Sequence, residues 1–116
     1  MTKNSTIQIQ AGCRVAGYIS SASKKHNVIE VFDVLEVTDN EHYRCHKIGT
    51  KFDQSDRNIY LQEHQLNWCR LSNGKEFYRK STEENWQELN PPIGKTEKSL
   101  SESLIPIFRK NTNTKK

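Results

Sequence analysis

The stretch that decides the fold is Val28-Ile-Glu-Val-Phe-Asp-Val-Leu-Glu-Val37, in which half of the positions are Val or Ile. Side chains branched at Cβ favour extended backbone, so this composition predicts one long, bent strand over residues 28–37. A helix is the alternative, since Asn27 with Glu30 resembles a capping box and apolar residues also recur at helical spacing, at Val28, Val31, Phe32 and Leu35. We prefer the strand, because Asp39-Asn40 marks a turn directly after it.

Further strands are predicted on both sides of this stretch from alternating apolar positions and turn residues. Residues 12–19 alternate, with Val15 on one side and Arg14 on the other, and a polar loop follows at residues 20–27. After the turn, residues 41–48 return as the second strand of a hairpin. Two short strands are then expected around a tight turn at residues 63–65, namely residues 58–62 and 66–71.

The C-terminal part is predicted to contain two more hairpins. Asn73-Gly74 is the strongest turn signal in the chain and favours a type I′ turn, in which both central residues have positive φ. Residues 77–80 and 85–89 are expected to form the second hairpin. Ser81 with Glu84 also matches a capping box, so a short helix is the alternative there. Pro91-Pro92 closes the predicted domain.

The distribution of charge separates a neutral domain from a basic tail. Residues 1–89 contain 12 Lys and Arg against 12 Asp and Glu, whereas residues 90–116 contain 6 against 2. We therefore expect a flexible N-terminus over residues 1–10, a folded domain over residues 11–92, and a disordered basic tail over residues 93–116. The predicted fold is all-β: a small five- to seven-stranded antiparallel barrel or meander.

Composition also bounds the compartment and the class of protein. The first ten residues are polar and no long apolar run follows, so neither a secretory signal nor a membrane span is expected. The chain has three cysteines, an odd number without the close spacing of a metal knuckle, which favours reduced core thiols in the cytoplasm.

Five residues give the chain a resemblance to a known fold. The opening strand with Gly12 and Val15, and the later element with Leu61, Glu63 and Leu66, resemble the small Src-homology-3-like β-barrels of bacterial and organellar proteins. The resemblance covers about half of the chain. It implies a barrel and carries no catalytic residues.

Residues 68–92 also look similar to a WW domain. The resemblance rests on aromatic residues, one glycine and a proline pair in that family's order: Trp68, Gly74, Phe77, Tyr78, Trp86, Pro91 and Pro92. The interval between Tyr78 and Trp86 is shorter than the family's. We therefore favour a structural role, in which these aromatic side chains staple a small sheet.

No sequence motif indicates catalysis, because the chain lacks a phosphate-binding glycine loop, a nucleophile elbow and a paired-carboxylate signature. A small zinc-binding protein is a remote alternative, with ligands drawn from Cys45, His46, His64 and Cys69. Buried thiols and surface histidines are the favoured interpretation of these residues. We expect no cofactor and no enzymatic activity.

Single-stranded DNA or RNA is the alternative type of partner. A single-strand binder combines phosphate-neutralising cations with aromatic stacking platforms. The candidate residues are Lys24, Lys25, Arg70, Lys75, Tyr78, Arg79 and Lys80. The neutrality of residues 1–89 argues against this alternative.

The tail contains one apolar island, Leu104-Ile105-Pro106-Ile107-Phe108, within a polar segment. Such an island in a disordered segment is typical of a peptide that folds onto a partner. It is similar to the peptides by which bacterial replication and repair proteins bind the sliding clamp, although Glu102 stands where that family has Gln. Packing of the island back onto the barrel is the alternative.

The sequence thus predicts a non-enzymatic barrel adaptor from a prokaryote or its virus, which binds a protein partner and uses the tail peptide as a second contact. The expected core consists of Val15, Val31, Leu35, Tyr43, Ile59, Leu61, Leu66 and Trp68.

Overall fold

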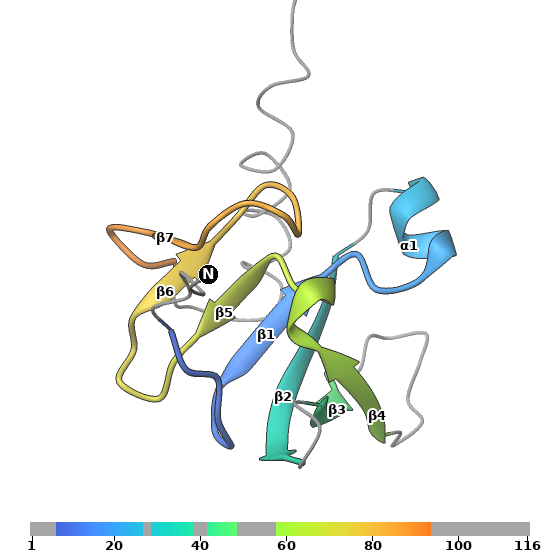
Figure 1. The fold of residues 1–116 in the computed structure, drawn as a ribbon, viewed down its shortest axis with the longest axis horizontal. Coiled ribbons are helices and arrows are strands. Elements are labelled where there is room, and N and C mark those ends of the chain that lie inside the picture. Colours follow the sequence, from blue (N-terminus) through green and yellow to red (C-terminus); the bar gives the residue numbers. More distant parts are fainter. Residues whose placement is uncertain (1–6, 27–28, 39–41, 49–57, 94–116) are drawn as a thin grey trace, which may run out of the picture.

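Seven antiparallel strands form one sheet, which confirms the predicted all-β class (Figure 1). The computed structural model describes residues 7–26, 29–38, 42–48 and 58–93. The strand order is β4-β3-β2-β1-β5-β6-β7. The elements are β1 (Arg14–Gly17), α1 (Ser21–His26), β2 (Glu30–Val37), β3 (His42–Lys47), β4 (Asn58–Gln62), the 3-10 turn η1 (Glu63–Gln65), β5 (Trp68–Arg70), β6 (Glu76–Tyr78) and β7 (Gln87–Glu88).

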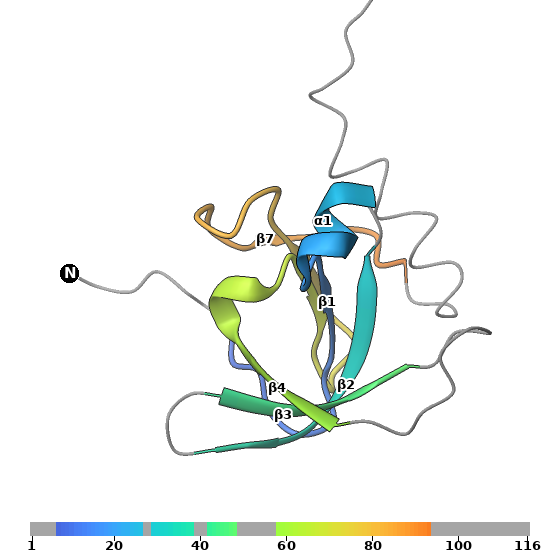
Figure 2. The same cartoon turned by 90° about the vertical axis from the view of Figure 1, so that its right-hand side faces the viewer.

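The long strand predicted at residues 28–37 forms as β2, and it joins the two halves of the sheet. Residues 30–33 pair with β1 and residues 32–37 pair with β3, so the strand belongs to both halves. Figure 2 shows β3 and β4 crossing below β1 and the first half of β2. A register shift between Val34 and Glu36 interrupts the pairing with β3. A β-bulge of this kind bends a strand, which lets β2 pair with strands in both halves of the sheet.

The segment after β1 differs from the prediction, because part of the expected polar loop forms the short helix α1. Ser20 caps it: its Oγ accepts a hydrogen bond from the backbone N–H of Ser23 at 3.0 Å. The Ser23 hydroxyl donates back to the Ser20 carbonyl at 2.8 Å. Serine at this position satisfies backbone donors that a helix start leaves unpaired. In the sequence this capping serine could not be distinguished from the other polar residues of the segment.

Apolar side chains are buried on both faces of the sheet. One cluster fills the inner face, and its largest fully buried members are Phe32, Leu61 and Leu66, with Val15 from β1. A second cluster lies on the outer face, built from Ala16, Ile29, Val31 and Trp68. Adjacent residues of β1 therefore belong to different clusters, as strand alternation requires.

Most of the predicted core is buried, with two differences. Val15, Val31, Tyr43, Leu61, Leu66 and Trp68 are buried and Ile59 is half-buried. Leu35 is 40% exposed, so its assignment to the core was wrong. It is the additional residue at the β2 register shift, where Val34 takes the inward position. In the opposite direction, Ile7 and Ile9 pack in the inner cluster although residues 1–10 were expected to lie outside the domain.

The C-terminal hairpins form, with one correction to the turn. Leu71 N–H donates to the carbonyl of Lys75, and Gly74 N–H donates to the carbonyl of Leu71, both at 2.9 Å. These bonds enclose the three residues 72–74, which is a three-residue loop rather than the predicted two-residue type I′ turn. Gly74 has φ +95°, as such a loop requires of its last residue.

Residues 81–89 adopt the hairpin rather than the short helix, because β7 pairs with β6 and residues 81–84 form a turn. Leu89 and Ile93 then pack against the outer cluster. The packed part of the chain therefore includes Ile93, which the sequence interpretation had assigned to the tail.

The burial pattern leads to a paired stability prediction. Leu61→Ala should lower the free energy of unfolding by about 2–5 kcal/mol, because it removes a fully buried side chain from the inner cluster. Leu35→Ala should lower it by less than about 1 kcal/mol, because Leu35 is exposed. Urea denaturation of both variants measures the difference. Equal losses would contradict the strand register on either side of the bulge.

Candidate functional site

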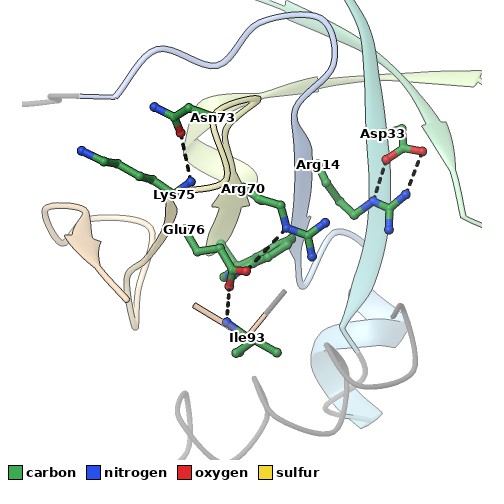
Figure 3. A network of polar contacts seen from close by, with 8 residues as sticks. Arg14, Asp33, Arg70, Asn73, Lys75, Glu76 and Ile93 are labelled. Carbon is green, nitrogen blue, oxygen red and sulfur yellow. Dashed lines mark hydrogen bonds and ion pairs between the residues drawn. The ribbon is translucent and has the colours of Figure 1, made fainter. Parts of the chain in front are cut away.

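Glu76 is a fully buried carboxylate that holds three donors on the outer face of the sheet (Figure 3). The Trp68 indole N–H donates to Oε1 at 3.2 Å. The backbone N–H of Ile93 donates to the same oxygen at 2.9 Å. Arg70 Nε lies 3.5 Å from Oε2. A buried carboxylate is tolerated only when it is paired and hydrogen-bonded in this way, so Glu76 fixes β5, β6 and the segment that follows β7 to one another.

Strand pairing places Arg70 opposite Glu76 on one side and opposite Arg14 on the other. The Arg14 guanidinium binds both oxygens of Asp33, at 2.7 and 3.2 Å. Figure 3 shows the two arginines side by side, each directed to its own carboxylate. The guanidinium of Arg70 also lies over the Trp68 ring, 5.5 Å from its centroid. The charges of the two arginines are therefore balanced within the sheet by Asp33 and Glu76.

Arg79 is a structural residue rather than part of a cationic surface. Its side chain is buried, and Nε donates to the carbonyl of Leu66 at 2.9 Å. Nη2 donates to the carbonyl of Glu63 at 2.6 Å. The guanidinium lies 4.3 Å from the centroid of Trp86, whose indole N–H donates to Glu63 Oε2 at 2.9 Å. Burial lowers the pKa of Arg79 from its ordinary value, and the charge of Glu63 opposes that shift.

This second cluster of polar contacts joins η1 to the β6–β7 hairpin. Because the guanidinium is committed to two backbone carbonyls, it is not available to a nucleic-acid phosphate. These contacts therefore argue against the alternative prediction that Arg79 binds nucleic acid. Burial of Trp68 and the engagement of Trp86 fit the interpretation that these aromatic side chains staple the sheet.

The other basic candidates do not form one surface. Lys24 and Lys25 are exposed in the last turn of α1, whereas Lys75 is exposed beside the loop between β5 and β6. Figures 1 and 2 place that loop and α1 at opposite ends of the molecule. Tyr78 and Lys80 are half-buried, and Tyr78 packs against the outer cluster. The sequence pattern had grouped these basic residues into one nucleic-acid-binding set, whereas the fold places them apart.

The weak zinc-ligand set is not brought together. Cys45 and Cys69 are buried in the inner cluster, His46 contacts Asn58 at 3.3 Å, and His64 is exposed on η1. Within residues 7–26, 29–38, 42–48 and 58–93, no group of three or more His, Cys, Asp or Glu side chains could hold a metal ion. Desolvation raises the pKa of the Cys45 thiol from 9.0 to about 12, with a further contribution from Asp33, and it also raises the pKa of Cys69.

The tail peptide, Leu104, Ile105, Pro106, Ile107 and Phe108, lies outside the described residues. The sequence interpretation did miss exposed apolar side chains that lie at separate places on the sheet, because Val37 pairs with the inward-facing Tyr43 whereas Tyr60 pairs with Arg44 on the other face. Three large apolar side chains are exposed on β2 and β4: Leu35 (40%), Val37 (44%) and Tyr60 (58%). The uncharged run Asn58-Ile-Tyr-Leu-Gln62 was a sequence signal for Tyr60 alone.

Comparison with known proteins gives no relative: no family model, curated protein or solved structure matches the chain. Among the described helices, none is long and apolar enough to cross a membrane.

The Glu76 contacts predict a specific loss of stability. Glu76→Gln keeps the shape of the side chain but removes the charge that balances Arg70, and should lower the free energy of unfolding by about 1–3 kcal/mol. Glu88→Gln on exposed β7 is the control and should change it by less than about 0.5 kcal/mol. Urea denaturation gives both values. A loss for Glu76→Gln no larger than the control's would mean that the carboxylate does not hold these elements together.

The buried thiols predict an alkaline loss of stability. In the unfolded chain a thiol ionises near its ordinary pKa of 9.0, whereas Cys45 in the folded chain stays protonated to about 12. The unfolded state therefore binds fewer protons above pH 9, and stability falls there by up to about 1.4 kcal/mol per pH unit for each such thiol. Denaturation between about pH 8 and about pH 10.5 measures the slope. The slope should be shallower in Cys45→Ala, and an identical slope would contradict the assignment.

Proposed function

We propose that this chain is a non-enzymatic adaptor of the small Src-homology-3-like barrel class, and that it binds a protein partner. The class assignment is supported by the order of the first five strands, β4-β3-β2-β1-β5, and by the 3-10 turn η1 that joins β4 to β5. Fold alone does not imply function. The proposed partner class therefore rests on the surface.

The observation that carries the proposal is the contrast between engaged cations and exposed apolar side chains. Arg14, Arg44, Lys47 and Arg70 each pair with a carboxylate, and Arg79 is buried. Nucleic-acid affinity depends mainly on cations available to phosphates. The largest exposed apolar side chains instead lie on β2 and β4, the two neighbours of β3.

An exposed group of apolar side chains on a small domain is typical of protein contact. Leu35 and Val37 lie at the end of β2, beyond the residues that pair with β1. This end of β2 is the proposed docking surface of the barrel. Its side chains are aliphatic and flank Glu36, which is already paired with Arg44 at 3.0 Å. The surface therefore presents little net charge and suits an apolar partner surface.

The tail peptide is the proposed second contact. Two weak contacts joined by a flexible linker strengthen each other, because the first raises the effective concentration of the second. In residues 104–108, Phe108 is the proposed anchor, since aromatic side chains in desolvated pockets carry much of the energy of an interface. Residues 93–116 also carry a formal net charge of +4, equal to that of the whole chain, which favours association with an acidic partner.

Affinity capture from extracts of the source cell tests the proposal with the tagged full chain. The double change Leu35→Lys and Val37→Lys should reduce partner retention at least tenfold, because charge is placed on an apolar interface. Phe108→Ala should also reduce it, by about 30-fold if the anchor carries about 2 kcal/mol. Gln87→Lys on exposed β7 is the matched control and should bind like the unchanged chain.

The nucleic-acid alternative has a different signature. It draws on the exposed Lys24, Lys25 and Lys75, which make no ion pair with any described residue. Retained material that is nucleic acid, that is released steeply by salt, and that is insensitive to the changes at Leu35 and Val37 would overturn the adaptor proposal. Melting curves of each variant would show whether the fold is intact.

A further inference from the structure

The two edges of the sheet are protected to different degrees. Edge strands expose unpaired backbone groups, and proteins usually guard them with charge, proline, bulges or short length. The β7 edge is guarded: it has two residues, includes Glu88, and is followed by Pro91 and Pro92. The β4 edge has five residues and no charged side chain. It pairs with β3 in unbroken register from Asn58↔His46 to Gln62↔His42.

The other side of β4 pairs with no strand among the described residues. The strand lies at the margin of the sheet in Figure 1. At its centre, Tyr60 is 58% exposed, the most exposed large apolar side chain of the described residues. Because Tyr60 pairs with Arg44, between the inward-facing Tyr43 and Cys45, its ring stands on the outer face.

The sequence of β4 is chemically symmetric about Tyr60. Reading outward from the centre, Ile59 and Leu61 are the aliphatic flanks, and Asn58 and Gln62 are the carboxamide ends. The aliphatic pair faces inward, where Leu61 is buried and Ile59 packs against the inner cluster. An edge of this kind matches itself when a second strand runs in the opposite direction.

We propose that the partner of the β4 edge is a second copy of this chain, paired antiparallel about a two-fold axis at Tyr60. In this register Tyr60 lies opposite Tyr60, Ile59 opposite Leu61, and Asn58 opposite Gln62. Both kinds of residue pair in an antiparallel ladder allow such an axis, so backbone pairing does not oppose it. Opposite side chains on one face lie close enough for aromatic, aliphatic and amide pairs to form.

A second copy fits this edge better than an unrelated strand. Two-fold symmetric dimers require a self-complementary patch, in which each residue meets its own equivalent or its counterpart across the axis. The side chains of the β4 edge meet that condition at every position and bring no like charges together, and at its end the second copy would replace Gln65 Oε1, which accepts from the Gln62 backbone N–H at 2.9 Å. The inference does not depend on the adaptor proposal, whose docking surface is the end of β2. If both hold, the dimer carries two docking surfaces and two tails.

Charge reversal at the axis tests the dimer. The full chain should show concentration-dependent dimerisation by sedimentation velocity between about 10 µM and about 1 mM, the range of a small interface. Tyr60→Lys alone and Tyr60→Glu alone should each dimerise at least tenfold more weakly, because like charges meet at the axis. An equimolar mixture of the two variants should dimerise again.

The control is Leu35→Lys, which adds the same charge at an exposed apolar position off β4 and should leave dimerisation unchanged. It also separates the two proposals, since it should impair partner capture without affecting the dimer. A chain that stays monomeric at about 1 mM, or variants whose mixture remains monomeric, would overturn the inference.

Disulfide trapping tests the register. Opposite Cα atoms in an antiparallel pair are about 4.5–5.5 Å apart, within the range that a disulfide spans. Tyr60→Cys should therefore form an intermolecular disulfide under mild oxidation. Asn58→Cys should not, because its copy lies about four residues further along the ladder, roughly 13 Å away. The native cysteines are buried, so they should not compete. Equal trapping at both positions would overturn the proposed register.

Discussion

The carboxylate of Glu76 is the constraint on which the outer half of this structure depends. This fully buried carboxylate accepts hydrogen bonds from the Trp68 indole and the Ile93 backbone N–H, and it pairs with the Arg70 guanidinium. An unpaired carboxylate there would be strongly unfavourable, so its three donors are held in a fixed arrangement. The donors come from β5 and from the segment after β7. By binding the Ile93 N–H, the carboxylate also holds that segment against the outer cluster.

A related arrangement at η1 completes the attachment of the β6–β7 hairpin. Arg79 satisfies two backbone carbonyls around the 3-10 turn and stacks on Trp86, which returns a hydrogen bond to Glu63. In both arrangements an arginine side chain satisfies buried oxygen atoms: Arg70 pairs with Glu76, and Arg79 binds two backbone carbonyls. The consequence for function is direct, since charge engaged inside the fold is unavailable to a partner. What remains exposed on β2 and β4 is largely apolar, and this is why we favour a protein over a nucleic acid.

Sequence patterns predicted the elements better than their details. The strand at residues 30–37 and the last hairpin followed from β-branched content and turn residues, which act locally. Leu35 was misplaced because strand alternation holds only while the register is continuous, and a bulge depends on the neighbouring strand. The helix α1 was missed because a single capping serine decided it within a polar run. Among the proposed site residues, Arg79 and Arg70 were candidates for phosphate contacts, but in the structure they bind backbone carbonyls and the Glu76 carboxylate.

The sequence by itself determined the all-β class, the strand order along the chain and most of the inner core, because alternation and turn propensity are properties of neighbouring residues. Only the tertiary structure decided which charged groups are neutralised, which face of β1 meets which cluster, and which edges of the sheet stay open. Those features arise from pairing between strands far apart in the chain, such as Arg14 with Asp33 and Arg70 with Glu76. Local patterns contain no information on such partners, since long-range pairing is selected by the burial and charge balance of the whole sheet.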